Sequence, residues 1–315
     1  MSEARRLAPA AESTQNRPIL TTDGGAIRAR PRFAALRSLW RHKLALIGAL
    51  IVATAVFVAI FAPLLTPHNP ETINIVQRLK PPGFRTPDGT LHVLGTDTLG
   101  RDVLARLVYG ARISLAVGLS AVFIAGSIGV LLGLISGYSG GKIDDIIMRI
   151  GDIQLAFPFI LLAISVLAVL GPGVGKLIAV LGFTGWVQYG RIVRSQVVSF
   201  REMEFVDAAR SIGARNWRIM LRHILPNVWS AVIVIASFSV ASTIISEASL
   251  SFLGLGVPPQ VPTWGGMLSD SREYLEIAPW LVVFPGFAIA LTVLGINVLG
   301  DWIRDFLDPR MKNLV

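Results

Sequence analysis

Long apolar runs separated by shorter polar segments are the dominant pattern of this chain. A helix needs about 20 residues to cross the hydrocarbon core of a bilayer. Six runs are long enough: 44–65, 113–141, 153–175, 177–200, 227–246 and 278–299. The fourth carries Arg191 and Arg194 near one end, where long cationic side chains can extend to the interface. The pattern therefore predicts an all-α membrane protein with six transmembrane helices.

The second run is rich in glycine. Its glycines recur at spacings of three and four residues: Gly118, Gly126, Gly129, Gly133 and Gly137. Small residues at this spacing lie on one face of a helix and let a neighbouring helix approach closely. We expect this run to pack tightly against another span.

The polar segments divide the chain into five parts. We expect an N-terminal tail at 1–43, a first transmembrane helix at 44–65, a polar insert at 66–112, a helical core at 113–303 and a C-terminal tail at 304–315. The N-terminal tail is polar and irregular, which favours disorder, and it has no apolar stretch typical of a signal peptide. In the second half of the insert we expect an interfacial helix capped by Asp97 or Thr98. Residues 142–149 predict a short charged turn.

Composition supports the membrane assignment. Hydrophobic residues make up 53% of the 315 residues and charged residues 16%, against about 25% charged in a soluble domain. The chain has no cysteine, which excludes disulfides, cysteine-bound zinc and thiol chemistry. The net charge of +9 would suggest nucleic acid as the partner of a soluble protein, but here it fits basic cytoplasmic loops.

The distribution of Lys and Arg predicts the topology. Four segments, namely the N-terminal tail, 142–149, 191–222 and the C-terminal tail, hold 21 of the 29. Positively charged loops stay on the cytoplasmic side of a membrane. Both tails and the polar stretch 201–226 are therefore expected in the cytoplasm, and the insert 66–112 outside.

The stretch 201–226 predicts two short helices joined by a turn. Gly213 is suited to end the first helix, because glycine adopts positive φ without a steric clash. The second helix has an apolar face with helical spacing, formed by Trp217, Met220, Leu221 and Ile224. Pro226 marks the point where the chain turns into the fifth run. A DNA-binding helix-turn-helix has the same outline, but one tethered between two spans cannot easily lie along a duplex. An ordinary connector is the other alternative.

The same stretch resembles a known motif. Asp207-Ala208-Ala209, Gly213 and His223-Ile224-Leu225-Pro226 are similar to the Glu-Ala-Ala…Gly…Ile-x-Leu-Pro loop of ABC importer permeases, with Asp in place of the usual Glu and His in place of the usual Ile. Residues 94–115, 248–268 and 299–310 resemble dipeptide and oligopeptide permeases, specifically the member of the pair with the longer N-terminal region. The resemblance covers roughly residues 33–312.

This resemblance implies a function and a set of partners. The chain is expected to be a multi-pass permease subunit of the bacterial inner membrane that binds no cofactor and no nucleic acid. Its partners would be a homologous permease, two cytoplasmic ABC ATPases, an external substrate-binding protein and membrane lipid. The cargo would be dipeptides or oligopeptides, with nickel or another small solute as alternatives. The residues that couple to the ATPase would be Asp207, Ala208, Ala209, Gly213, Trp217, Leu221, Leu225 and Pro226.

The chain offers little enzyme chemistry. Residues 171–176 look like a phosphate-binding loop, but Leu170 and Leu177 stand where that motif requires Gly and Ser or Thr, so we expect a tight turn between two spans. The histidines at 42, 68, 92 and 223 lack metal-ligand spacing. We therefore expect no metal site, no catalytic residue, and ATP hydrolysis only by partner subunits.

Glu247 is the acidic residue that interrupts an apolar stretch deep in the chain. Carboxylates within a membrane usually face a cavity or a partner. Glu247 is a candidate for the substrate path, with structural pairing or an interfacial position as the alternatives.

Two other functions stay open beside the importer, namely a membrane scaffold whose basic loop recruits a partner and a secondary transporter. The latter would need ion-coupling carboxylates, and Glu247 alone comes near that requirement.

Overall fold

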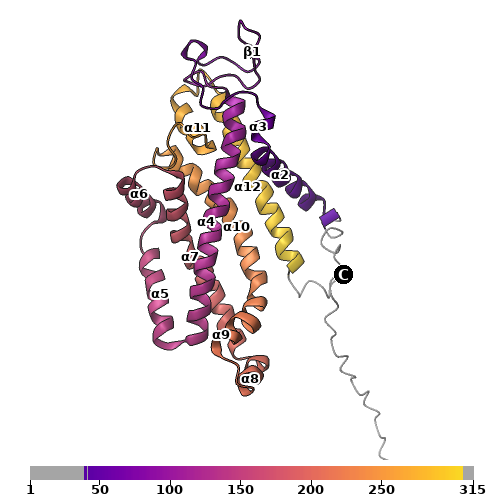
Figure 1. Ribbon diagram of the computed structural model, residues 1–315, viewed down its shortest axis with the longest axis vertical. Helices are drawn as coiled ribbons and strands as arrows, with labels where there is room; N and C mark the ends of the chain where they lie inside the picture. Colours follow the sequence, from indigo (N-terminus) through magenta and orange to yellow (C-terminus); the bar gives the residue numbers. More distant parts are fainter. Residues whose placement is uncertain (1–38, 41, 308–315) are drawn as a thin grey trace, which may run out of the picture. The chain divides into compact units, whose positions relative to one another are not determined.

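Helices make up most of the described chain. The computed structural model describes residues 39, 40 and 42–307, all within one compact unit. The expectations for the rest of both tails lie outside these residues. The helices that carry the predicted runs are α2 (Lys43–Ile60), α4 (Val103–Ser139), α6 (Phe159–Leu170), α7 (Val174–Arg201), α10 (Leu225–Phe252) and α12 (Trp280–Leu307). The prediction of an all-α membrane protein is confirmed (Figure 1).

The number of helices that can cross a membrane differs from the six predicted. Four described helices are long and apolar enough to cross a membrane: 43–60, 103–139, the continuous helix 216–252, and 280–307. α5 (Gly141–Leu155) and α6 pass the same test together, although they are bent by 85° at their junction. α7, which carries Lys176, Arg191, Arg194 and Arg201, is not among them. The third predicted run, 153–175, is therefore not one straight helix, since it is divided between the end of α5 and α6 at this bend. The other five runs lie mainly on one helix each, and four of those helices are long and apolar enough to cross a membrane.

The glycine spacing in α4 accommodates α7. A Cβ added at Gly129 would lie 2.5 Å from the carbonyl oxygen of Trp186, and one at Gly133 would lie 2.7 Å from that of Gly190. Only glycine permits this backbone approach. The predicted tight packing is confirmed, and α4 and α7 run side by side in Figure 1.

α4 begins earlier than expected. It starts at Val103 rather than Ile113, and it continues without a break to Ser139. The predicted caps, Asp97 and Thr98, are wrong, because the Asp102 side chain accepts a hydrogen bond from the backbone N–H of Ala105 at 2.7 Å. The amphipathic segment expected at the interface is therefore the first part of a spanning helix.

Two further boundaries differ from the predictions. Residues 142–149, expected as a charged turn, lie within α5, where Asp144 forms an ion pair with Arg194 of α7 at 2.5 Å. That pairing lets a charged segment stay helical. At the other end of the core, the first predicted run is divided at Phe61, since α2 ends at Ile60 and α3 (Ala62–Leu65), with Pro63 in its first turn, follows.

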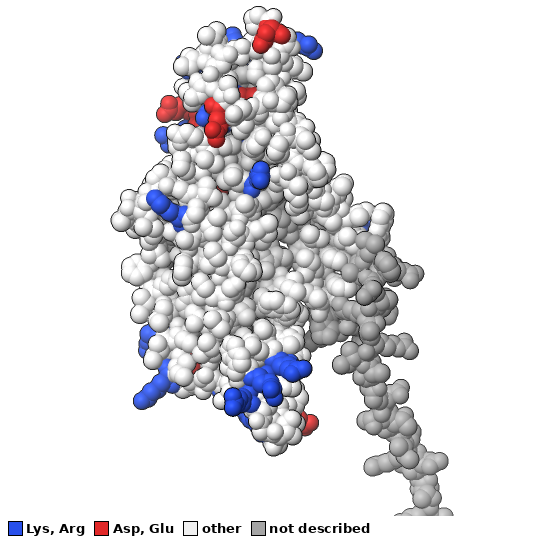
Figure 2. Space-filling model, in the orientation of Figure 1, with Lys and Arg blue, Asp and Glu red and all other residues white. Residues whose placement is uncertain are grey.

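The polar insert forms a small structure at one end of the helices. It contains a 3₁₀ turn η1 (Ile75–Gln77) and an antiparallel hairpin of β1 (Phe84–Arg85) and β2 (Leu91–His92) that pairs Phe84 with His92. α11 (Trp264–Ser271), followed by the 3₁₀ turn η3 (Arg272–Tyr274), lies at the same end (Figure 1). Figure 2 shows charged side chains gathered at the two ends of the helices and an almost uncharged band between them. This distribution is the one a membrane requires.

Candidate functional site

The predicted coupling loop forms a compact cap at the end of the helices opposite the insert (Figure 1). It consists of α8 (Glu204–Ser211), α9 (Asn216–Ile219) and the π-helical turn η2 (Met220–Ile224). The expected turn at Gly213 between two helices is present, but the second helix is not short, because α9 and η2 continue directly into α10. Every ATPase-coupling residue inferred from the sequence lies in this cap or in the first turn of α10.

Gly213 ends α8 through hydrogen bonds typical of a Schellman motif. Its φ is +77°. Its N–H donates to the carbonyl of Arg210 at 2.9 Å, and the N–H of Ala214 donates to the carbonyl of Ala209 at 3.0 Å. The two bonds satisfy carbonyls at the end of α8 and fix the direction in which the chain enters α9.

One face of the loop is buried against the spanning helices. Val206, Ala209, Ile219 and Ile224 join a core cluster that includes Tyr138 of α4 and Val197 of α7. Burying a side chain such as Ile219 stabilises the packed state by roughly 1.5 to 3 kcal/mol. The loop is therefore anchored to the spans.

The opposite face leaves large apolar side chains exposed. Ile212 is 86% exposed, Trp217 57% and Leu221 37%. Asp207 and Ala208 are also exposed, and Asp207 forms an ion pair with Arg210 at 3.2 Å. Exposed apolar side chains of this size are typical of a surface that binds another protein.

The predicted apolar stripe of the second helix is divided between these two faces. Trp217 and Leu221 are exposed, whereas Ile224 is fully buried. The π-helical turn η2 is the reason, because its i→i+5 hydrogen bonding widens the turn and rotates Ile224 away from Trp217. Expecting all four residues on one face was wrong.

Pro226 does not turn the chain. The helix runs continuously from 216 to 252, with Pro226 in the first turn of α10. A proline inside a helix lacks an N–H and clashes with the preceding turn. The π-helical turn just before it relieves that clash, and the Asn227 side-chain amide donates to the carbonyl of His223 at 2.6 Å. Leu225, which precedes the proline, is half-buried.

Polar contacts that the sequence did not indicate also anchor the loop. The Tyr138 hydroxyl at the end of α4 donates to Asn216 Oδ1 at 3.1 Å, and the Arg201 guanidinium donates to the Tyr138 carbonyl at 3.2 Å. Arg210 lies over the Tyr138 ring, 5.6 Å from its centroid. Tyr138 thus contacts both arms of the loop.

Glu247 is buried between helices. Its carboxylate accepts hydrogen bonds from the hydroxyls of Ser114 on α4 at 3.0 Å and Ser251 on α10 at 2.7 Å. The backbone N–H of Trp264 lies 3.4 Å from Ser114 Oγ and donates to it. Glu247 has no exposed surface. This arrangement joins α4, α10 and the start of α11.

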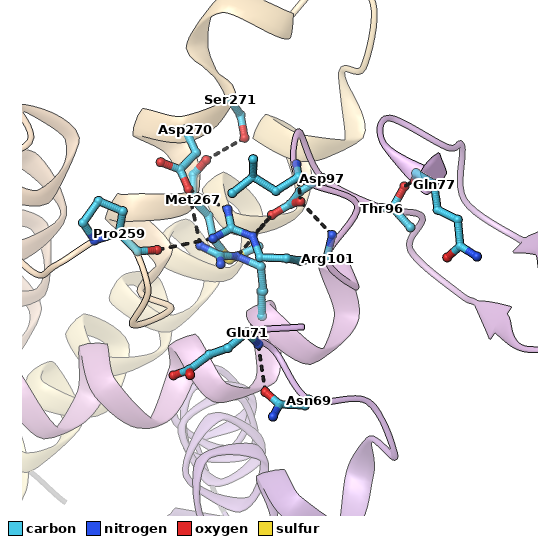
Figure 3. A network of polar contacts seen from close by, with 12 residues as sticks. Asn69, Glu71, Gln77, Thr96, Asp97, Arg101, Pro259, Met267, Asp270 and Ser271 are labelled. Carbon is cyan, nitrogen blue, oxygen red and sulfur yellow. Dashed lines mark hydrogen bonds and ion pairs between the residues drawn. The ribbon is translucent and has the colours of Figure 1, made fainter. Parts of the chain in front are cut away.

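A network of ion pairs fixes the insert to α11 (Figure 3). Arg101 donates to Asp97 at 2.6 Å and to Asp270 at 3.1 Å. Arg106 of α4 lies 3.5 Å from Asp97 and 3.4 Å from Asp270. The two arginines and Asp97 are buried, so removing one charged side chain of the network would leave an uncompensated charge.

Two of the scattered histidines come together in the insert. His68 and His92 stack with ring centroids 5.1 Å apart, and His92 Nδ1 lies 2.7 Å from Asp102 Oδ2. Across the residues that the structure describes, no group of three His, Asp or Glu side chains is arranged to hold a metal. The pair supports the Asp102 cap of α4.

The segment that resembles a phosphate loop is a turn between α6 and α7, as expected. α6 ends at Leu170, Gly171 has φ +77°, and α7 begins at Val174. The Lys176 ammonium donates to the carbonyl of Leu170. The lysine is thus engaged within its own turn.

Comparison with known proteins identifies the family. Residues 129–313 match the binding-protein-dependent transport system inner membrane component family, and residues 33–82 match the N-terminal transmembrane domain of oligopeptide transport permease C. The chain belongs to this family of transport permeases. The resemblance inferred from the coupling loop and its flanking motifs is therefore confirmed, and this permease is a transport subunit rather than an enzyme.

Curated relatives extend over most of this permease. It is 47% identical to the dipeptide transport system permease protein DppC of Alkalihalophilus pseudofirmus, covering 89% of this chain and 90% of the relative. It is 45% identical to the glutathione transport system permease protein GsiD of Escherichia coli, with 88% and 89% covered. It is 40% identical to the oligopeptide transport system permease protein OppC of Bacillus subtilis, with 87% and 91% covered. These relatives give no support to the nickel alternative.

A solved structure supports the fold. A chain of the inward-facing MetNI methionine ABC transporter matches with a TM-score of 0.55 at 18% identity, and the match covers 65% of this permease and 97% of that chain. The helical core of this permease therefore has the fold of an ABC importer permease.

Proposed function

We propose that this permease forms one half of a peptide path through the bacterial inner membrane. A homologous permease would supply the other half, an external binding protein would deliver di- or oligopeptides, and two cytoplasmic ATPases would drive transport. The dipeptide, oligopeptide and glutathione relatives support a peptide cargo. The scaffold and secondary-transporter alternatives have no comparable support.

The coupling loop carries the mechanical part of the proposal. Its exposed face presents Trp217 and Ile212 to a partner, while its buried face packs Val206 and Ile219 against α4 and α7. An ATPase that binds the exposed face and moves would pull on a unit that is packed against the spans. Closure of the ATPases on ATP would thereby become a rigid-body motion of the helices.

In the proposed importer, Glu247 has a structural role, because it holds helices together. Its two serine donors lie on α4 and α10, and the start of α11 is attached through Ser114. The substrate-path role inferred from the sequence stays a prediction, and a carboxylate that is already hydrogen-bonded between helices favours the structural alternative.

Reconstitution tests the proposal. The permease, its partner permease, the ATPases and the binding protein would be assembled in proteoliposomes, and uptake of labelled dipeptides, glutathione and Ni²⁺ would be measured with and without ATP. We expect peptide uptake that requires ATP and the binding protein. Uptake driven by an ion gradient without ATP would indicate a secondary transporter, and an assembly with no uptake would indicate a scaffold.

A further inference from the structure

A small polar cavity lies along the helical core, away from the coupling loop. It has a volume of ≈ 220 Å³ and lies among α4, α6, α7 and α10. Its polar lining comes from Thr184, Gln188 and Tyr189 on α7 and from Ser239, Ser242, Thr243 and Ser246 on α10. No charged side chain lines it.

The position of these residues is unusual for a membrane helix. They lie near the middle of α7 and α10, and the side chains of Gln188 and Ser242 are exposed on the surface of this single chain. Polar groups at such depth are costly against lipid and generally face a water-filled path or a partner subunit. This face of the permease is therefore one that lipid does not cover in the assembled transporter.

Two buried hydroxyls in the cavity retain unused hydrogen-bonding capacity. Tyr189 is 1% exposed and Ser239 is 8% exposed. The two hydroxyls lie toward each other, and neither has a further partner among the described residues. Each hydroxyl can both donate and accept, so the pair retains hydrogen-bonding capacity that a ligand in the cavity could use.

Three other hydroxyls of the lining complement those two. Thr184 donates to the carbonyl of Val180 at 2.7 Å, Ser242 to that of Ser239 at 3.0 Å, and Ser246 to that of Ser242 at 2.9 Å. Each of these hydroxyls donates its hydrogen to a carbonyl of its own helix, so its oxygen can still accept a hydrogen bond. The wall thus offers acceptors from these three, donors from Tyr189 and Ser239, and both from the Gln188 amide.

We propose that this cavity is a contact site for the main chain of a peptide during translocation, and that it does not distinguish peptide side chains. A peptide bond presents one N–H donor and one C=O acceptor in every residue, which matches the mixed wall. With no charged group in the lining, acidic, basic and neutral peptides would be held alike. The proposal rests on the proposed peptide-importer function, because it names the chemistry by which that path contacts its cargo.

Cysteine labelling tests whether the cavity is open to water and to peptide. This chain has no cysteine, so Ser242→Cys introduces a single thiol, provided that cysteine-free partner subunits are used. Ser237→Cys on the same helix, which faces an apolar groove, is the matched control. In the assembled importer a charged thiol reagent should modify position 242 roughly tenfold faster than position 237, since the reactive thiolate forms in water. A transported dipeptide should slow only the reaction at 242. Equal rates at both positions, or no effect of peptide, would overturn the proposal.

Removing the two hydroxyls tests recognition of the main chain. Tyr189→Phe and Ser239→Ala keep the shape of the cavity, and Ser237→Ala is the control. Each cavity variant should lower peptide uptake by about threefold to tenfold, because the loss of one neutral hydrogen bond weakens binding by about that factor. The decrease should be the same for acidic, basic and neutral dipeptides. ATP hydrolysis stimulated by the binding protein should persist, because the coupling loop is unchanged. Unaltered uptake, or a loss confined to one charge class, would contradict the inference. Failure of the proposed function itself would differ, since the unmodified importer would then show no ATP-dependent peptide uptake.

Discussion

Gly213 has the backbone conformation that glycine adopts most readily, with φ +77°. A Cβ added there would meet no atom within 4 Å. Substitution is therefore strained by backbone conformation alone, by about 1 to 2 kcal/mol for an ordinary L-residue. The strain would be relieved by a rotation of the turn, which would misplace Trp217 and its neighbours.

Two substitutions at Gly213 test whether this conformation matters for coupling to the ATPases. Gly213→Val should leave the amount of permease in the membrane near normal while weakening co-purification of the ATPases and abolishing uptake. Gly213→Asn should retain most of both, because asparagine tolerates the left-handed region. The measurement is ATPase pull-down and peptide uptake, normalised to permease in the membrane. If the valine variant behaves like the unmodified protein, the loop is a connector and the coupling role must be abandoned.

Two substitutions distinguish a structural role of Glu247 from a role in the substrate path. Glu247→Ala leaves Ser114 and Ser251 without their acceptor and should destabilise the purified permease by about 1 to 3 kcal/mol, measured as a lower thermal midpoint in detergent. Glu247→Gln keeps a carbonyl acceptor and should retain most of the stability and the uptake. A glutamine variant that is stable but transports nothing would instead establish a role for the carboxylate in the substrate path.

At the scale of whole elements, the contact between α4 and α7 depends on glycine. A Cβ at Gly133 would lie 2.7 Å from the carbonyl oxygen of Gly190, whereas one at Gly286 in α12 would meet nothing within 4 Å. Gly133→Ala should separate the two helices and destabilise the permease by about 1 to 3 kcal/mol. Gly286→Ala, the same change in another spanning helix, should be close to neutral. Thermal unfolding of the two variants in detergent compares them, and equal midpoints would mean that α4 and α7 are not tightly packed.

At the scale of the whole molecule, the two polar ends should lie on opposite sides of the membrane. The excess of Lys and Arg around α8 and α9 predicts that this end lies in the cytoplasm and the insert outside. In intact cells, an impermeant thiol reagent should label Asp88→Cys in the hairpin and should leave Ser211→Cys unlabelled until the membrane is opened. Both side chains are exposed, so accessibility within the fold does not confound the result. Labelling of position 211 in intact cells would reverse the proposed topology.

Much of this permease follows from local properties of its sequence. The apolar runs predict the spanning helices, because the requirement to bury an uncharged segment in lipid depends on composition and length. The turn at Gly213 is predictable because glycine, unlike other residues, readily adopts positive φ. The motif that resembles the coupling loop of ABC importer permeases could be recognised for the same reason, since its residues are consecutive or nearly so.

The tertiary structure decided what depends on contacts between distant residues. Asp102 rather than Asp97 caps α4, and the turn before Pro226 is π-helical, because both choices depend on what packs around them. The contact of Glu247 with Ser114 joins positions separated by 133 residues. The polar cavity likewise exists only where the middle of α7 meets the middle of α10. Hydrophobic pattern places a segment in the membrane, but only packing between helices determines which side chains meet.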